Sequence, residues 1–472
     1  MKRLLKAIPN TACLLPLAAA VLLAGCDGGG AEPAPLQPIK VAVRVNPASY
    51  YWLDHHPTGL DHSLLRLFAE KQGIRLEIVP TVTIAEAVQL LEANQVQIAA
   101  GALSADESLK ERFLLSPPYE YIRQKLIYRY PDTGPAGLDR VAMKDIDISP
   151  HPGHLETLRL ARKKNHDFTE WYLHENTDSH TLIEWVNLGL IRYTLADSSE
   201  LAATQLFHPY VKAAFDVSGE LPVVWLFRKD APATLTGAVA DFFSEITGSR
   251  ELDRLIDVHH PHVKELSYAE KLTFRELADR QLPKYSDEFR RVARLHGLDW
   301  KLLAAISYQE SHWNPRAVSP TGVRGLMMLT RDTARQHGIT DRADPRGSIL
   351  GGALHFLAVR NKIPDTIPEP DRTWMALAAY NSGYGHLKDA IVLTEQRGGN
   401  PDLWVDIEKA LELLQKPEWY RQAQHGKPRG GDTSLYVRNV RNYQRLIDMI
   451  EGDITTDIPR PSRLNDLAPA TL

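Results

Sequence analysis

The feature that most constrains the fold of this chain is a change of sequence pattern near Leu266. Before this residue, short β-branched runs alternate with helical patterns. After it, leucine-rich helical repeats dominate, and Gly and Pro mark the ends of the helices. The chain has 472 residues, of which 43% are hydrophobic, so it can bury two or three separate cores. The sequence therefore predicts a multidomain protein with an α/β part followed by a mostly α part.

The first part has the element order of a parallel α/β sheet. Its expected strands are Ile39–Val45, Leu76–Val79, Val96–Gly101, the neighbourhoods of Asp145–Ser149 and Tyr193–Ala196, and Val223–Phe227. Helical patterns separate these strands, as in βαβ units. The last strand should return toward the first ones. We therefore expect two lobes joined by crossing strands, with a cleft between them.

The N-terminal end has the composition of a bacterial lipoprotein signal peptide. Three basic residues near the start, Lys2, Arg3 and Lys6, precede the apolar run Ala12–Ala24, which ends in small residues before Cys26. This run is too short to span a bilayer as a mature helix. We expect residues 1–25 to be a signal peptide that is cleaved before a lipidated Cys26. The alternatives are an uncleaved anchor or a plain signal with a chance cysteine.

The cysteine count agrees with a lipid attachment at Cys26. Cys13 is the only other cysteine of the chain, and it lies inside the predicted signal. The mature chain could then form no internal disulfide, although an oxidising compartment would allow one. Residues 26–38, rich in Gly, Ala and Pro, are expected to be a linker, and residues 455–472 a disordered tail.

Charge and histidine content argue against several classes of ligand. The net charge is −4 and the basic residues are spread along the chain, so nucleic-acid binding is not expected. His259, His260 and His262 lie in a linker region without a carboxylate at helical spacing. Such a group is more often polar surface than a metal site. We expect neither a metal nor a cofactor.

One carboxylic acid in the helical part has the setting of a general acid. Asp299 is a plausible N-cap for a helix from Trp300 to about His312, in which Ile306 and Glu310 share the apolar face. Desolvation there would raise the pKa of Glu310 and keep it protonated near neutral pH. The alternative is a Glu at a helix end that is satisfied by a neighbouring Arg.

The motifs around Glu310 decide between these two interpretations. Glu310-Ser311 is followed by Asn314-Pro-Arg-Ala-Val-Ser319 and by Gly325-Leu-Met327, and later by Ala379-Tyr-Asn381 and Tyr436. This ordered series closely resembles the signature of lytic transglycosylases with a lysozyme-like fold. Several motifs in the expected order are far more specific than any one of them. The resemblance implies that residues 266–454 are a peptidoglycan-cleaving domain with Glu310 as its catalytic residue.

The resemblance also implies which residues bind the glycan. The glycine turn lets the backbone approach a sugar ring closely. The tyrosines could instead be core residues, and packing and cleft lining are equally plausible for the two methionines. The family usually has Gln at the position of Met328, which puts one substrate hydrogen bond in question. The branch called membrane-bound lytic murein transglycosylase F has a similar methionine-rich element and a fused N-terminal domain. The implied substrate-binding residues are Ser311, Ser319, Gly325, Met327, Met328, Tyr380, Asn381 and Tyr436.

The chemistry that the resemblance implies needs a single carboxylic acid. Most glycosidases place two carboxylates across the scissile bond, but these motifs contain no second acid. The family cuts between N-acetylmuramic acid and N-acetylglucosamine and leaves 1,6-anhydromuramic acid ends without consuming water. Two alternatives stay open: a lysozyme-type muramidase, and a solute receptor whose C-terminal part binds glycan without catalysis.

The α/β part resembles periplasmic solute-binding domains that capture amino acids, and we place it at residues 39–265. The likeness lies in Gly59-Leu-Asp61, Gln97-Ile-Ala-Ala-Gly101 and Ser116-Pro-Pro-Tyr119. Those domains usually hold the ligand carboxylate with an Arg where this chain has Ser108, with Arg112 one helical turn later. A muropeptide or amino-acid ligand and a vestigial site are equally plausible. The candidate ligand-binding residues are Asp61, Arg112, Tyr119 and Asp197.

Two cues to location conflict. The family resemblance favours the periplasmic face of the outer membrane, with the lipid on Cys26 as the anchor. Asp27 directly follows this cysteine, and in some bacteria such an Asp retains lipoproteins at the inner membrane. We expect the outer membrane. The predicted partners are glycan strands, the membrane and a small ligand of the first domain.

Overall fold

The computed structural model describes residues 38–164, 170–205, 208–260, 266–427, 432–451 and 454–455. The predicted signal peptide, the lipid attachment site Cys26, residues 27–37 of the linker, His262 and residues 456–472 lie outside the described residues.

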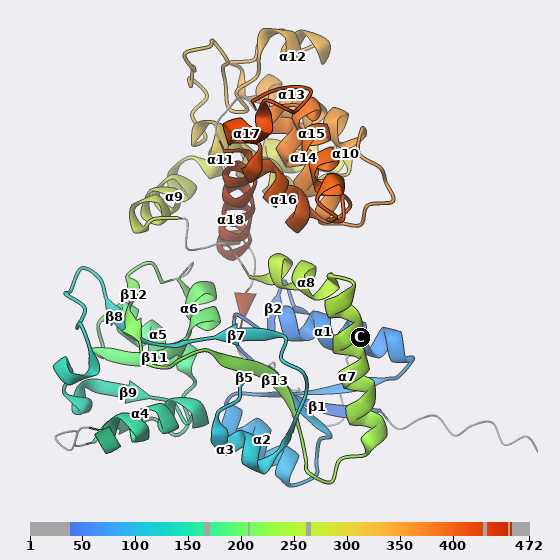
Figure 1. Cartoon of the computed structure of the whole chain (residues 1–472). Helices are drawn as coiled ribbons and strands as arrows, with labels where there is room; N and C mark the ends of the chain where they lie inside the picture. The colour runs from blue at the N-terminus through green and yellow to red at the C-terminus, as the bar shows by residue number, and fades with distance from the viewer. Residues whose placement is uncertain are drawn as a thin grey trace, which may run out of the picture. The chain divides into compact units, whose positions relative to one another are not determined.

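The first lobe is a sheet with helices on both faces (Figure 1). The sheet has the order β4-β1-β5-β13-β6, and β7 also pairs with β13. Its strands are β1 (Ile39–Arg44), β4 (Leu76–Thr81), β5 (Ile98–Ser104), β6 (Leu114–Leu115), β7 (Glu120–Ile122) and β13 (Leu221–Phe227). One face packs on α1 (Leu60–Gln72), α7 (Ala233–Gly248) and α8 (Glu251–His259), and the other on α2 (Ile84–Glu92) and α3 (Glu107–Arg112).

The central strands lie parallel, as the sequence predicted. β1 runs parallel to both β4 and β5, while β13 is antiparallel to β5. Gly101 in β5 has a φ of 108°, and a Cβ there would lie 2.4 Å from the backbone nitrogen of Arg44. Only glycine allows the two strands to approach this closely.

The second lobe is a separate five-stranded sheet of order β10-β9-β11-β8-β12. Its elements are β8 (Gln124–Arg129), β9 (Ile146–Ile148), α4 (Pro152–Lys164), β10 (Tyr172–Leu173), α5 (Ser179–Leu188), β11 (Tyr193–Asp197), α6 (Ser198–Thr204) and β12 (Val211–Asp216). The chain enters this lobe after β7 and returns to the first sheet through β13. The predicted two-lobed α/β fold is confirmed.

A buried ion pair joins the two lobes. Arg44 at the end of β1 donates a hydrogen bond to Glu200 of α6 at 2.6 Å and to Ser179 of α5 at 2.9 Å. Both charged side chains are only 3% exposed, so the pair is shielded from water. Removal of one partner would leave the other charge buried and uncompensated, which is strongly destabilising.

A small sheet corrects the predicted start of the C-terminal tail. Strands β2 (Tyr51–Leu53) and β3 (His56–Thr58) form a hairpin, and β14 (Ile454–Thr455) pairs antiparallel with β2. Thr455 therefore belongs to a strand and not to a disordered tail. The strand β14 pairs through its backbone with residues far away in the sequence. The residues around it therefore carry no local signal that predicts a strand.

From Leu266 onward the described chain is mostly helical. The helices are α9 (Tyr268–Arg280), α10 (Ser286–His296), α11 (Trp300–Ser311), α12 (Arg331–Gln336), α13 (Pro345–Arg360), α14 (Asp371–Ser382), α15 (Tyr384–Gln396), α16 (Trp404–Leu413), α17 (Pro417–Tyr420) and α18 (Thr433–Glu451). They enclose one hydrophobic core, in which Trp313 and Trp404 are fully buried. This is the mostly α part that the pattern change predicted.

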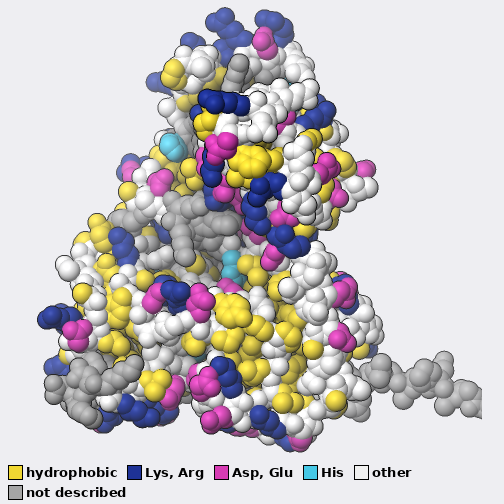
Figure 2. All heavy atoms as spheres, viewed as in Figure 1, with side chains coloured by type: hydrophobic (Ala, Val, Ile, Leu, Met, Phe, Trp, Pro, Cys, Tyr) yellow, Lys and Arg dark blue, Asp and Glu magenta, His cyan; other side chains and the backbone are white. Residues whose placement is uncertain are grey.

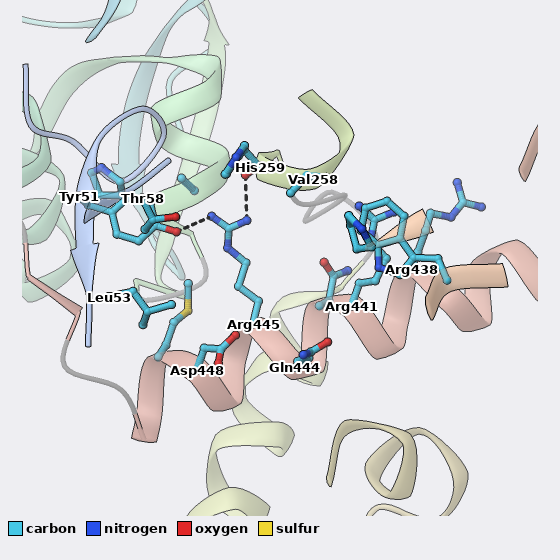
Figure 3. A pocket seen from close by; sticks show the side chains of 16 residues that line it. Tyr51, Leu53, Thr58, Val258, His259, Arg438, Arg441, Gln444, Arg445 and Asp448 are labelled. Atoms are coloured by element: carbon cyan, nitrogen blue, oxygen red, sulfur yellow. Dashed lines mark hydrogen bonds between the residues drawn. The ribbon is translucent and has the colours of Figure 1, made fainter. Parts of the chain in front are cut away.

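Helix α18 also contacts residues of the α/β part. Arg441 forms an ion pair with Asp257 of α8 at 3.1 Å. Arg445 donates hydrogen bonds to the backbone oxygen of His259 and to the hydroxyl of Tyr51, as Figure 3 shows. Tyr51, His259, Arg441 and Arg445 border a cavity of about 290 Å³.

The surface agrees with the modest net charge. On the face drawn in Figure 2, Lys and Arg side chains are interspersed with Asp and Glu. Within the described ranges, no helix combines the length and the apolar character that crossing a membrane requires.

Candidate active site

Glu310 lies in the last turn of α11. The helix begins after Asp299, whose carboxylate accepts a hydrogen bond from the backbone of Lys301 at 2.9 Å, and it ends where His312 takes a left-handed φ of 52°. The predicted N-cap is confirmed, and the predicted helix end is correct to within one residue. Ile306, one turn before Glu310, is fully buried, while Glu310 itself is partly exposed. The carboxyl group is therefore set in apolar packing yet open to a substrate.

Helix α18 brings Tyr436 to this carboxyl group. The Tyr436 hydroxyl donates a hydrogen bond to Oε1 of Glu310 at 2.8 Å. Burial raises the pKa of Glu310 to about 7, although the bond from Tyr436 acts in the opposite direction. Burial also raises the pKa of Tyr436 well above its ordinary value, so this hydroxyl keeps its proton. A carboxyl group with a pKa near 7 can both give and accept a proton at neutral pH.

Among the described residues, no second carboxylate acts on Glu310. Burial and the Tyr436 hydroxyl account for the shifted pKa of Glu310, and among the described residues no other carboxylate contributes to it. An acid paired with a close second carboxylate would feel its charge, and the pKa of Glu310 shows no such effect among the described residues.

Tyr380 and Asn381 lie at the end of α14. The Tyr380 hydroxyl donates a hydrogen bond to the backbone oxygen of Met327 at 3.3 Å, and burial followed by the nearby charge of Glu310 raises its pKa well above the ordinary value. The side-chain oxygen of Asn381 is buried and has no hydrogen-bond partner among the described residues. A buried amide oxygen without a partner is a natural acceptor for a substrate N–H or O–H group.

The turn between α11 and α12 depends on Gly325. This glycine has a φ of 86°, and a Cβ there would lie 1.9 Å from the backbone oxygen of Arg342. Ser311 donates a hydrogen bond to the backbone oxygen of Leu326 at 2.8 Å. Ser319 accepts one from the backbone of Val323 at 3.2 Å. In the structure, both predicted substrate-binding serines hold the turn in place.

The two predicted methionines have different surroundings. Met327 is 1% exposed and packs so closely on α13 that a Cβ on Gly352 would lie 2.6 Å from its side chain. Met328 is partly exposed and has a φ of 44°, a left-handed conformation that is rare for a side-chain-bearing residue. Of the two, Met328 is the one whose side chain a substrate can reach.

The predicted ligand residues of the α/β part fall into three separate places. Asp61 is 1% exposed and accepts hydrogen bonds from Ser49, Tyr119, Trp225 and the backbone of Ala102. Arg112 lies on the surface and pairs with Glu92 at 2.5 Å. Asp197 ends β11 in the second lobe.

Sequence reasoning missed the partners of Asp197. His151 and His154 lie beside its carboxylate, and all three side chains are buried. The His-x-x-His spacing at the start of α4 was the available signal, but nothing local connects it to a strand end about 45 residues later. Within the part of the chain that the structure describes, this is the one group of three His, Cys, Asp or Glu side chains whose potential ligand atoms lie within 4.8 Å of one another.

The histidines that the sequence did single out have other partners. His259 shares a hydrogen bond with Ser63 at 2.8 Å, and His260 pairs with Glu120 at 3.0 Å. Their side chains thus engage different elements.

Comparison with known protein families matches both parts of the chain. The Transglycosylase SLT domain family matches residues 288–402, and the family of bacterial extracellular solute-binding proteins, family 3, matches residues 39–262. The first range contains Glu310 and Asn381, whereas Tyr436 lies beyond it.

Several full-length relatives are similar over most of the chain. A membrane-bound lytic murein transglycosylase F 1 from Alkalilimnicola ehrlichii is 37% identical over 91% of this chain and 87% of its own length. Proteins named membrane-bound lytic murein transglycosylase F from Pectobacterium atrosepticum and Idiomarina loihiensis are 39% and 38% identical, over 86% and 88% of this chain and 84% and 91% of their own lengths. A solved structure of a putative L-cystine ABC transporter from Listeria monocytogenes is 16% identical, with a TM-score of 0.44, over 48% of this chain and 96% of that one.

Proposed function

The chain belongs to the membrane-bound lytic murein transglycosylase F family, and from this premise we propose that Glu310 is the catalytic acid and base of a peptidoglycan lytic transglycosylase. The observation that carries the assignment is the pKa of about 7 at a partly exposed carboxyl group that Tyr436 holds in place. The enzyme is a lyase that acts on the glycan strands of the cell wall.

The reaction uses the two protonation states of Glu310 in turn. Protonated Glu310 gives its proton to the oxygen between N-acetylmuramic acid and N-acetylglucosamine, and the bond from that oxygen to C1 breaks. The N-acetyl group of the muramyl residue stabilises the cation that forms at C1. The Glu310 carboxylate then takes the proton of the muramyl C6 hydroxyl while the C6 oxygen bonds to C1. Atoms balance without water, and the product has a 1,6-anhydro ring.

Tyr436 positions the acid for both steps. Its hydroxyl occupies Oε1 of Glu310, so Oε2 is left to carry the proton toward the substrate. Donation to the carboxylate stabilises the charged state, which keeps the pKa from rising further. Asn381 and the backbone of the Gly325 turn are the proposed contacts to the sugar, together with Tyr380 and Met328.

The decisive experiment is the substitution Glu310→Gln. Gln keeps the shape of the side chain and can still accept the Tyr436 hydrogen bond, but it has no proton to give. Loss of a general acid typically lowers the rate by about 100- to 10,000-fold. We expect purified sacculi to stay intact with this variant while it still binds them. Activity within tenfold of the wild type would refute the role of Glu310.

Glu276→Gln is the matched control, because Glu276 is an exposed acid of the same domain that pairs with Arg280. It should leave cleavage unchanged. Mass spectrometry of the wild-type products separates this function from that of a muramidase, because anhydro ends lack one water relative to reducing ends. Reducing ends alone would favour the muramidase.

We propose that the protein is held at the periplasmic face of the outer membrane by a lipid on Cys26. The names of the relatives describe membrane-bound proteins, and the signal sequence and the single mature cysteine supply the attachment. Asp27 makes the inner membrane the competing location. Separation of the two membranes, followed by immunodetection, decides between them.

We also propose that residues 39–265 form a domain that binds a small ligand such as a muropeptide or an amino acid. The family match to solute-binding proteins supports this assignment. Asp61 and Tyr119 already bond to each other inside the first lobe, so the ligand would need other groups or a rearrangement. Calorimetry with stem peptides tests the proposal, and an absence of heat at millimolar concentration would contradict it.

A further inference from the structure

The cavity of about 290 Å³ beside helix α18 has no part in the reaction described above (Figure 3). Tyr51 and Leu53 of β2, His259 of α8 and Arg445 of α18 are among the residues that line it, and Glu310 is not. Sites for small molecules typically measure roughly 300–1,000 Å³. The cavity therefore has room for a small organic molecule.

Arg445 supplies this cavity with a positive charge that no carboxylate neutralises. Its guanidinium donates hydrogen bonds to the backbone oxygen of His259 at 2.8 Å and to the hydroxyl of Tyr51 at 3.4 Å, both uncharged acceptors. Among the described residues it forms no ion pair, because Asp448, which also lines the cavity, pairs with Lys301 at 2.8 Å instead. A guanidinium has five N–H donors, so several are left for a ligand.

The charged side chains that line the cavity are mostly basic. Arg438, Arg441 and Arg445 line it at spacings of three and four residues along α18, and Asp448 is the one acid of the lining. The first two arginines are already paired with acids outside the lining, as Arg441 is with Asp257 at 3.1 Å. A ligand with one negative charge would therefore find its partner in Arg445.

Asn442 adds a second donor that has no partner. Its side chain is 2% exposed and lines the cavity, and its amide nitrogen is buried without a hydrogen-bond partner among the described residues. A buried donor without a partner destabilises the folded state and calls for an explanation. An acceptor oxygen of a bound ligand would satisfy this nitrogen.

The rest of the wall is suited to an apolar body. Leu53, Val258, Met449 and Trp374 line the cavity. The indole ring of Trp374 is held from one side, because the guanidinium carbon of Arg441 lies 3.7 Å from the ring centroid. The planar fork of an arginine matches the two oxygens of a carboxylate. The combination of basic and apolar groups fits a carboxylic acid with an uncharged, apolar remainder.

We propose that this cavity binds a small organic carboxylate, with its charge on Arg445 and Asn442 and its apolar part beside Trp374. The ligand is a monoanion, because a second buried negative charge would have no free partner in the wall. The bound molecule would contact β2, α8 and α18 at once and would thus connect the helix that carries Tyr436 to the α/β part.

The first test compares two probes on the untagged full chain in detergent. Phenylacetate carries the proposed charge, and phenylacetamide has nearly the same shape without it. Calorimetry should show one phenylacetate bound per chain. The amide should bind about 10- to 100-fold more weakly, which is the usual worth of a hydrogen bond to a charged group. Equal affinity for the two probes would overturn the proposal, as would no binding of phenylacetate at millimolar concentration.

The second test locates the bound probe. Arg445→Gln removes the charge and should weaken phenylacetate binding at least tenfold. Arg280→Gln is the matched control, because Arg280 is an exposed arginine of α9 that pairs with Glu276, and it should bind like the wild type. An unchanged affinity in Arg445→Gln would place the probe elsewhere and overturn the proposal.

Asn442→Leu gives an independent measurement, which also decides if Arg445→Gln fails to fold. Leu has nearly the same shape and no buried donor, so the chain without ligand should melt at a higher temperature than the wild type. The same variant should bind phenylacetate more weakly. Unchanged binding by this variant would contradict the proposed contact.

Discussion

Burial of the Glu310 carboxyl group should lower the stability of the folded chain at pH values where this group would otherwise be charged. The substitution Glu310→Gln should remove this loss of stability. Burial raises the pKa of this carboxyl group from 4.5 to about 7. The charged form is therefore disfavoured in the folded state. Below pH 4.5 both the folded and the unfolded chain bind the proton, and the raised pKa costs nothing. As the pH rises from 4.5 to 7, the unfolded chain loses the proton first, and stability falls.

The size of the effect follows from this shift of pKa. Each unit corresponds to about 1.4 kcal/mol, so the free energy of unfolding should fall by at most about 3 kcal/mol between pH 4 and pH 8. Solvent that reaches the partly exposed side chain reduces this value. Glu310→Gln carries no charge, so relative to the wild type it should gain up to that amount at pH 8 and almost nothing at pH 4.

Urea titrations followed by tryptophan fluorescence at the two pH values measure the difference. Glu276→Gln, an exposed acid on α9, should show no comparable gain and serves as the control. The reasoning is refuted if Glu310→Gln and the wild type unfold at the same urea concentration at pH 8. It is also refuted if the gain is as large at pH 4, because protonated Glu310 would then be the source.

Three further predictions concern other parts of the chain. Tyr436→Phe removes the hydrogen bond that favours charged Glu310, so the pKa of Glu310 should rise and the alkaline limb of the pH–rate profile should move to higher pH, as cleavage assays across pH can measure; an unchanged profile would contradict the contact. Gly325→Ala should cost at least about 2 kcal/mol of stability, visible as a lower melting temperature, because its Cβ would collide with the backbone of Arg342. Cys26→Ala should yield a protein that leaves the membrane fraction yet still cleaves sacculi, and sedimentation with membranes after a high-salt wash would argue against the lipid anchor.

The sequence predicted the parts of the site that depend on local pattern. The N-cap Asp299, the helix that follows it and the apolar face that carries Glu310 all depend on spacings of three or four residues. The return of β13 to the first sheet was also predictable, because a β-branched run after a second α/β unit has few other places to pair.

What the sequence could not predict depends on contacts between distant residues. The pairing of Thr455 with Trp52 has no local signature. The distinction between Met327 and Met328 depends on which side of a turn each occupies, which neighbouring residue types do not reveal. Likewise, Ser311 bonds to a backbone oxygen of the turn, although the family resemblance implied a role in binding substrate.

The hydrogen bond from Tyr436 makes the active site dependent on the integrity of the chain. Its two partners are separated by 126 positions in the sequence. A polypeptide interrupted anywhere between them, by stalled synthesis or by a protease that removes α18, keeps the acid but loses the group that orients it. An incomplete copy of this cell-wall-cutting enzyme that lacks α18 would thus have an impaired active site.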